Sequence, residues 1–256
     1  MNNIITNYKD KNFFVGAIFI NNQGCKGEIL GKVINKSNYF YIRFIKTKKT
    51  IIASRRNIKN GSFKDYFNPV VYGVGYLGEF KNGIKKNGKH IKSYSIWRSM
   101  LGRSYGNLYK SYENCKVCTE WHNFNNFKKW FDFNYIEGFE LDKDLLGNGK
   151  LYSPENCCFL PHSINSFMVL NKGQSKLKLG VYKSKGHQYE SRINNQGEPI
   201  YLGGFYTEEE AYRAWLQAKK NIAIELANKY KGIISEKSYN FLVLKDIRQI
   251  LNLKEE

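Results

Sequence analysis

Residues 139–169 read FELDKDLLGNGKLYSPENCCFLPHSINSFMV, and this stretch decides the fold of the central part of the chain. The glycine and asparagine residues of GNGK, at 147–150, predict a turn between the runs FELDKDLL and LYSPENCCFL. The two runs therefore predict a hairpin of two strands. A short helix is expected to follow from Pro161 to Val169, which makes the local order strand, strand and helix.

Helical periodicity precedes this hairpin. Large apolar side chains recur at core spacing between Tyr94 and Leu101, and aromatic side chains recur every three or four residues between Trp121 and Phe131. Such stripes are typical of helices that pack on a core. A platform on which nucleic acid bases stack is the alternative, and the core interpretation is preferred.

The N-terminal part shows a different pattern. From Phe13 to about Asn68, short β-type runs alternate with turns of Asn, Gly and Lys, which predicts a small all-β module. Arg55 and Arg56 follow the fourth run and suggest a basic rim, for which a merely solvated surface is the alternative. Residues 72–92 are rich in Gly, Asn and Lys and are expected to be a connector.

Another compact unit is predicted after the linker LNKGQSKLK. Three β-type runs, GVYKSK, QYESRINN and PIYLGGF, are separated by Lys-Gly and Gln-Gly turns. Thr207 can cap a helix that runs to about Tyr230, and the three glutamates after Thr207 suit the positive end of the helix dipole. One more amphipathic segment, at 239–251, precedes an acidic tail.

The charge of the chain indicates its kind of partner. Lys and Arg total 41 against 22 Asp and Glu, a net charge of +19, which attracts polyanions such as nucleic acid. A basic surface without a specific ligand is the alternative. No long apolar run and no secretory signal are found, so a cytoplasmic protein without membrane segments is expected. The odd number of cysteines favours thiols or metal ligands over disulfides.

Residues 141–165 resemble the HNH, or ββα-metal, nuclease family. Asp142 ends the first strand, Asn156 lies on the return strand and Asn165 lies on the helix, which is the family's order. The resemblance implies that Asp142 and Asn165 hold one divalent cation, Mg²⁺ or Mn²⁺, and that Asn156 fixes the loop. Oxygen ligands suit such cations, which stabilise the negative charge that develops during phosphodiester hydrolysis. A purely structural asparagine turn is the alternative.

The sequence departs from this family at Lys143, where the family places the histidine that activates water. A lysine can act as the base only if its pKa falls far below the ordinary value of about 10.4, and it can otherwise neutralise the phosphate. His162, one helical turn before Asn165, is the other candidate base or ligand, with a structural histidine as the alternative. Asp144 is expected on the same side of the strand as Asp142.

Two segments before the hairpin extend the likeness to phage-encoded HNH endonucleases, YSIWRSMLGRSY at 94–105 and CTEWHNFNNFKKW at 118–130. This lineage implies DNA cleavage, often by a free-standing homing enzyme in a bacterial host, and a restriction role is the alternative. Some ββα-metal nucleases also carry a structural zinc. Adjacent cysteines on a strand face opposite sides, so buried thiols are expected here instead of Zn²⁺. The candidate zinc ligands are Cys115, Cys118, Cys157 and Cys158.

Residues 179–230 resemble the Apetala-type domain of plant ethylene-response factors and its relatives in phage homing endonucleases. The matching segments include GVY at 180–182, YLG at 201–203 and EEAYRAW at 209–215. In that family a three-stranded sheet lies in the major groove of double-stranded DNA. The resemblance implies that side chains on the open face contact phosphates and base edges, and alternation leaves roughly half of the candidates on that face. The candidates are Tyr182, Lys183, Lys185, Tyr189, Arg192 and Asn194.

The chain is thus predicted to be an α+β protein that hydrolyses phosphodiester bonds in double-stranded DNA with the help of a metal ion. The alternative is a DNA-binding regulator whose nuclease module is inactive because lysine stands at the base position. The enzyme is preferred because only it explains why Asp142, Asn156 and Asn165 occur together. The predicted parts are a small all-β module at 1–70, an HNH-like nuclease module at 71–172, a three-stranded antiparallel sheet with a helix that binds DNA at 177–232, and a helical tail at 233–256.

Overall fold

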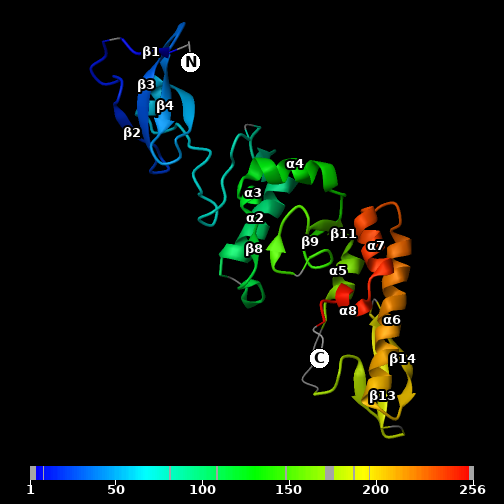
Figure 1. Ribbon diagram of the computed structural model, residues 1–256. Coiled ribbons are helices and arrows are strands. Elements are labelled where there is room, and N and C mark those ends of the chain that lie inside the picture. Colours follow the sequence, from blue (N-terminus) through cyan, green and yellow to red (C-terminus); the bar gives the residue numbers. More distant parts are fainter. Residues whose placement is uncertain are drawn as a thin grey trace. The chain divides into compact units, whose positions relative to one another are not determined.

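The computed structural model describes residues 4–7, 9–80, 82–107, 109–147, 149–170, 176–186, 188–195 and 197–253. The predicted α+β class is confirmed, because helices and mainly antiparallel sheets occur together (Figure 1). Backbone contacts divide the chain into unit 1, residues 1–105 and 119–128, and unit 2, residues 106–118 and 129–256. Most of the predicted linker, Gln196 of one predicted turn and the end of the acidic tail lie outside the described residues. No helix in the described ranges is long and apolar enough to cross a membrane.

The N-terminal part of unit 1 is an antiparallel sheet, as the short β-type runs predict. Its strands are β1 (Ile4–Ile5), β2 (Ile18–Ile20), β3 (Lys26–Val33), β4 (Lys36–Phe44) and β5 (Thr50–Ser54), in the order β1-β3-β4-β5 with β2 beside β3. Side chains alternate along β3 and β4, so Ile29, Phe40 and Ile42 are buried while their neighbours face outward. Helix α1 (Arg55–Lys59) closes this core with Ile58.

The remainder of unit 1 confirms that the predicted aromatic stripes form a core. Its elements are the hairpin strands β6 (Lys85–Lys86) and β7 (Lys89–His90), helix α2 (Lys92–Tyr105), helix α3 (Thr119–His122) and the start of α4 (Phe124–Asn134). Trp97, Trp121 and Phe124 are fully buried, and Trp97 Nε1 donates to the carbonyl of Trp121 at 2.7 Å. The helical periodicity predicted across 121–131 corresponds to two helices, because Asn123 separates α3 from α4 and its Oδ1 accepts a hydrogen bond from Asn125 N at the start of α4.

The central part of unit 2 confirms the order strand, strand and helix but corrects the predicted hairpin. Strand β9 (Glu140–Asp142) pairs with β11 (Cys158–Leu160), and α5 (His162–Met168) follows. Strand β10 (Leu151–Tyr152) instead runs parallel to β8 (Lys116–Val117), beyond a short 3₁₀ helix at Lys110–Tyr112. The carbonyl of Ser153 accepts from the amides of Asn156 and Cys157, and this turn breaks the predicted return strand in two.

The predicted sheet and helix at the C-terminal end of unit 2 are present. Strands β12 (Val181–Lys183), β13 (Tyr189–Asn195) and β14 (Glu198–Phe205) form an antiparallel sheet in chain order, followed by α6 (Glu208–Lys229). Thr207 caps α6 as predicted, since its hydroxyl accepts from Glu210 N while the Glu210 carboxylate accepts from Thr207 N. Trp215 is buried on the side of α6 that faces the sheet.

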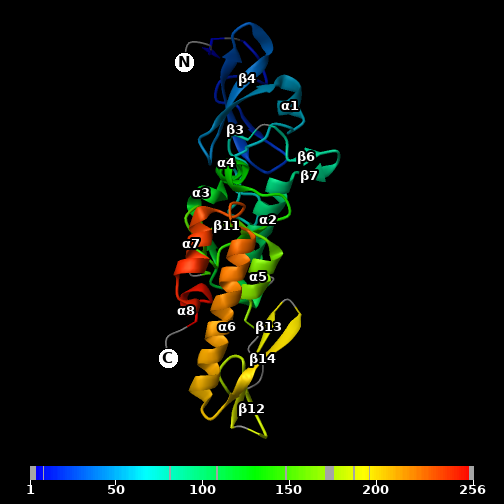
Figure 2. The same ribbon diagram turned by 90° about the vertical axis from the view of Figure 1, so that its right-hand side faces the viewer.

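The tail forms α7 (Glu236–Leu244) and α8 (Ile247–Ile250), which lie beside the C-terminal part of α6 (Figures 1 and 2). The ammonium of Lys220 joins α6 to the end of α7, because it donates to the carbonyls of Leu242, Val243 and Lys245 at 3.0, 2.8 and 2.6 Å. One hydrophobic core unites the hairpin, the sheet and the tail. Its buried members include Leu145, Leu160, Ile164, Ile193, Trp215, Leu226, Leu242 and Ile250.

Gly180 provides a test of how the sheet is held on α6. The residue has a φ of +74°, and a Cβ at this position would collide with the ring of Trp215. Gly180→Ala is therefore expected to lower the free energy of unfolding by about 2–4 kcal/mol, measured by urea denaturation. Gly186→Ala is the matched control, because no described atom lies within 4 Å of its added Cβ. Equal midpoints for the two variants would contradict the close approach of Gly180 to Trp215.

Candidate functional site

Asp142 is a buried carboxylate at the end of β9. Its side chain is 6% exposed, and Oδ1 accepts hydrogen bonds from the amides of Asp144 and Leu145 at 3.1 and 2.8 Å. Burial nevertheless raises the pKa of Asp142 to about 6. The free energy of hydration that the carboxylate loses on burial exceeds the stabilisation from these hydrogen bonds and from nearby charges. A positive charge beside Asp142 would offset the free-energy penalty of burying the ionised carboxylate.

Glu140 joins β9 to α5 and was missed by the sequence interpretation. One carboxylate oxygen lies 3.1 Å from His162 Nδ1, and the other accepts from Asn165 Nδ2 at 2.8 Å. His162 and Glu140 are both exposed. The signal was present in the sequence, since Glu140 and Asp142 alternate along one strand and share a side. The structure thus brings two of the predicted residues, His162 and Asn165, to one carboxylate.

The pairing with Glu140 also sets the chemistry of His162. A carboxylate can only accept a hydrogen bond, so Nδ1 of His162 is the donor. In the neutral ring Nε2 then carries the lone pair and can take a proton from water. Because the side chain of His162 is 79% exposed, a substrate or a water molecule can reach it.

Asn165 has an amide oxygen whose environment fits a cation. Oδ1 is buried and accepts no hydrogen bond from any described residue. A buried acceptor without a donor costs about 1–3 kcal/mol, and such groups in native proteins call for an explanation. No group of three or more His, Cys, Asp or Glu side chains in the described ranges is arranged to hold a metal. Mg²⁺ does not require one, because it commonly binds one or two carboxylates and completes its shell with water and substrate phosphate.

Lys143 is unsuited to the role of base. Its ammonium is buried, lies 2.8 Å from Asp144 Oδ1, and stands 5.1 Å from the centroid of the Tyr112 ring. Burial acts to lower the pKa of Lys143, but the hydrogen bond and charge of Asp144 outweigh it and the pKa is raised. The expectation that Asp144 follows Asp142 along one side of a strand is wrong, because β9 ends at Asp142 and the Asp144 carboxylate turns to Lys143.

Asn156 lies in the turn before β11, and not on a return strand as predicted. Its Nδ2 donates to the carbonyl of Leu151 at 3.4 Å, and its side chain packs so closely on Gly147 that a Cβ there would lie 3.0 Å away. These contacts tie the two ends of the loop together. They agree with an orienting role for Asn156 and leave its side chain without a direct part in binding a cation.

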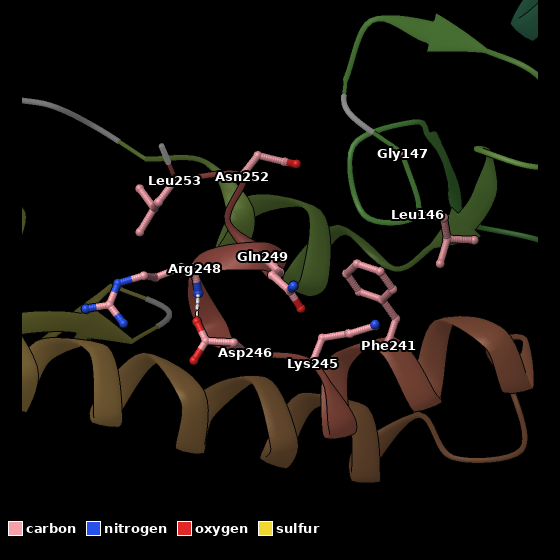
Figure 3. Close-up of a pocket in the computed structure, with 9 residues that line it drawn as sticks. All are labelled: Leu146, Gly147, Phe241, Lys245, Asp246, Arg248, Gln249, Asn252 and Leu253. Carbon is pink, nitrogen blue, oxygen red and sulfur yellow. Dashed lines mark hydrogen bonds between the residues drawn. The ribbon is translucent and has the colours of Figure 1, made fainter. Parts of the chain in front are cut away.

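The C-terminal tail holds the same loop from outside. Asn252 Nδ2 donates to the carbonyl of Asp144 at 3.0 Å, and Lys237 Nζ donates to the carbonyl of Glu155 at 2.7 Å. In Figure 3 the side chain of Asn252 points toward the loop segment at Gly147. Both residues line a cavity of about 660 Å³. The tail therefore restrains both ends of the loop that follows Asp142, a role that the sequence did not reveal.

The candidate zinc ligands are not assembled into a metal site. Burial raises the pKa values of Cys157 and Cys158, the latter to about 12, so both are neutral thiols at physiological pH. Cys158 pairs with Asp142 across the sheet, whereas Cys115 points its thiol toward the carbonyl of Gly149 at 3.9 Å. Among the described residues, the cysteines form no group of three or more that could hold a metal.

Two of the six predicted DNA-binding residues, Tyr182 and Arg192, are exposed on the open face of the three-stranded sheet, while Val181 and Ile193 alternate toward the core. Lys183 and Lys185 are exposed too, but Lys183 alternates to the side of Val181 and Lys185 lies in the loop after β12. The guanidinium of Arg192 lies 5.7 Å from the centroid of the Tyr182 ring and is bound by Glu190 at 2.6 Å. Glu190 therefore orients Arg192 on this face.

The other two candidates have structural partners. Tyr189 is half-buried, with the ammonium of Lys183 at 3.9 Å from its ring centroid. Asn194 is exposed, but its Oδ1 accepts from Gly197 N at 2.9 Å and shapes the turn between β13 and β14. Tyr201, which pairs with Arg192 across the sheet and is 58% exposed, is an additional member that sequence alternation on β14 could have found.

Comparisons of the chain with models of known protein families, with curated proteins and with solved structures identified no match.

Asp142→Asn tests the cost of the buried carboxylate. In the folded protein the carboxyl group binds a proton below about pH 6, but the unfolded chain releases it near about pH 3.9. Raising the pH through this interval therefore lowers the free energy of unfolding of the parent protein. In EDTA at pH 7 we expect the neutral variant to be more stable by about 1–3 kcal/mol, with the gain vanishing below about pH 4. Urea denaturation at each pH measures this, and a variant less stable at pH 7 would contradict it.

Proposed function

We propose that the chain is a metal-dependent endonuclease of the HNH type that cuts double-stranded DNA. The observation that carries this proposal is that two energetically unfavourable buried groups occur in the unit formed by β9, β11 and α5. Asp142 is a buried carboxylate with a raised pKa, and Asn165 presents a buried oxygen that accepts no hydrogen bond within the described part of the chain. A divalent cation offsets both costs, since it favours ionised carboxylates and oxygen ligands.

In this proposal Asp142 and Asn165 would hold Mg²⁺ or Mn²⁺, and the ion would stabilise the charge of the scissile phosphate. Glu140 keeps the amide of Asn165 turned so that Nδ2 is engaged and Oδ1 remains the ligand. Asn156 holds the loop that follows Asp142, and this loop in turn positions Asp142. Lys143, an ammonium with a raised pKa, contributes positive charge near the site.

The general base in this proposal is His162. The Glu140 carboxylate holds Nδ1 of its ring, as carboxylates do with catalytic histidines, and Nε2 takes the proton from the attacking water. This assignment replaces Lys143 as the base and explains how the chain can cleave DNA without a histidine at that position. As the water oxygen bonds to phosphorus, the bond from phosphorus to the leaving sugar oxygen breaks. His162 passes the proton of the water to solvent, which its exposed ring contacts, and solvent protonates the leaving oxygen.

We propose DNA as the substrate because of the side chains on the open face of the sheet formed by β12, β13 and β14. Tyr182, Arg192 and Tyr201 combine ring faces with a guanidinium that Glu190 orients, a set suited to phosphates and to guanine edges. The sheet shares its core with the hairpin, so DNA bound on the open face is held at a fixed place relative to the candidate site within unit 2. We propose a homing role for the cut, with restriction as the alternative.

The first test is cleavage of supercoiled plasmid and of DNA from around the gene. The parent protein is expected to nick or cut with Mg²⁺ or Mn²⁺ and to be inactive in EDTA. Asp142→Asn and Asn165→Ala are expected to lose activity to the metal-free level, and His162→Gln to lose about 10²-fold or more. Gel assays of initial rates measure these losses.

Asn221→Ala is the matched control for these variants, because Asn221 is an exposed asparagine on α6 that pairs only with Gln217 among its described hydrogen-bond partners. It should cut like the parent. Full activity of Asp142→Asn would remove the site assignment. A parent protein that binds DNA but never cuts it would favour the regulator, the alternative that Lys143 suggests.

The second test concerns the sheet. Arg192→Ala is expected to weaken DNA binding by about tenfold and to reduce the slope of affinity against salt concentration by about one, because one guanidinium contact is lost. Fluorescence anisotropy in EDTA measures both. Arg213→Ala is the matched control, since Arg213 is an exposed arginine on α6 that pairs with Glu209. Equal effects of both variants would leave Arg192 without a specific role.

A further inference from the structure

We infer that the N-terminal sheet of unit 1 is a second surface that binds duplex DNA. The inference shares its partner with the proposed function and does not depend on cleavage. The outward surface of this sheet, here called the outer face, includes Ile20, Lys26, Glu28, Tyr39, Arg43 and Ile52, and the ammonium of Lys36 reaches it at the ring of Tyr39. Nothing in the proposed nuclease site or in the C-terminal sheet uses these residues.

Charge is the first reason. Residues 1–70 contain thirteen Lys and Arg against three Asp and Glu, which gives +10 of the +19 of the whole chain. Residues 177–232, which hold the C-terminal sheet, contain nine Lys and Arg against six Glu, or only +3. Affinity for DNA depends mainly on how many phosphates a protein neutralises. Residues 1–70 therefore provide more of this electrostatic attraction than residues 177–232, which carry the Apetala-type resemblance.

Each of the three acidic residues in this region has a defined partner within the region. Glu28 binds Arg43 at 2.9 Å, and Asp10 binds Arg55. Asp65 accepts from the Thr47 hydroxyl at 2.7 Å and from Phe67 N at 2.9 Å. A protein partner recognised by charge would have to be strongly acidic, whereas DNA carries such charge along its whole length.

The architecture of the outer face is the second reason. Alternation along β4 buries Phe40 and Ile42 and leaves Tyr39 at 42% and Arg43 half-exposed. Ile20 and Ile52 are 61% and 51% exposed, although isoleucine is usually buried. Exposed apolar and aromatic side chains that share a face with cations mark an interaction site.

These side chains match the parts of a duplex. Lys26 is exposed on β3 opposite Ile20 of β2, and the ammonium of Lys36 lies 5.6 Å from the centroid of the Tyr39 ring. Lysine ammoniums and a tyrosine hydroxyl bind phosphate oxygens, while isoleucine side chains contact sugars. Contacts of this kind position a protein on DNA without reading its sequence, so the outer face is expected to bind with little sequence preference.

The test compares two double variants of the full chain that remove the same charge. Lys26→Gln with Lys36→Gln alters the outer face, and Lys229→Gln with Lys231→Gln alters exposed lysines at the end of α6. Anisotropy of a labelled duplex is measured in EDTA over a series of KCl concentrations, after circular dichroism has confirmed the fold. Loss of two phosphate contacts should lower the slope of log affinity against log salt by about 1.8 and weaken binding at least about tenfold at 0.1 M salt.

The control pair should keep most of the parent's affinity and slope. Adding Tyr39→Ala to the first pair should weaken binding further with little change in slope, because a ring contact carries no charge. Equal losses in both pairs would show that net charge alone matters and would overturn the inference, as would an unchanged affinity of the first pair. A parent that binds DNA through the outer face but cuts none would sink the proposed nuclease function and leave this inference intact.

Discussion

The hydrophobic core around α6 is the constraint on which unit 2 depends. Trp215 anchors the sheet near the start of the helix, and Leu226 lies further along in the same core as Leu160 and Ile164 of the hairpin and helix unit. The Thr207 cap fixes where this long helix begins, and Lys220 fixes where α7 ends against it. Because one core serves all these parts, the hairpin cannot shift against the sheet without exposing apolar surface to water.

The candidate site combines two polar groups whose burial is energetically unfavourable. A carboxylate is buried at Asp142 and a buried amide oxygen of Asn165 accepts no hydrogen bond in the described structure, although buried polar groups are normally satisfied. The surrounding loop is well restrained, by Asn156 within it and by Asn252 from the tail. Functional sites often contain buried polar groups that lower the stability of the fold, held in place by a rigid surrounding structure.

Positive charge is distributed unevenly along the chain. Residues 1–70, which hold the N-terminal sheet, carry +10 of the net charge of +19, whereas residues 177–232, which hold the C-terminal sheet, carry +3. Each sheet also has an arginine bound by a glutamate on the same face, Arg43 by Glu28 and Arg192 by Glu190. In the proposed binding of DNA, the charge of the N-terminal region contributes the larger part of the electrostatic attraction.

Local patterns in the sequence determined the α+β class, the strands of both large sheets except β1, the buried aromatic stripes and the start of α6 at Thr207, because alternation, helical periodicity and capping act over a few residues. Only the tertiary structure decided that β10 leaves the hairpin for β8, that Glu140 holds both His162 and Asn165, and that the tail grips the loop. These contacts join distant positions, 108 apart for Asn252 and Asp144. Periodicity shows which side chains turn inward, and the shared core alone decides which of them meet.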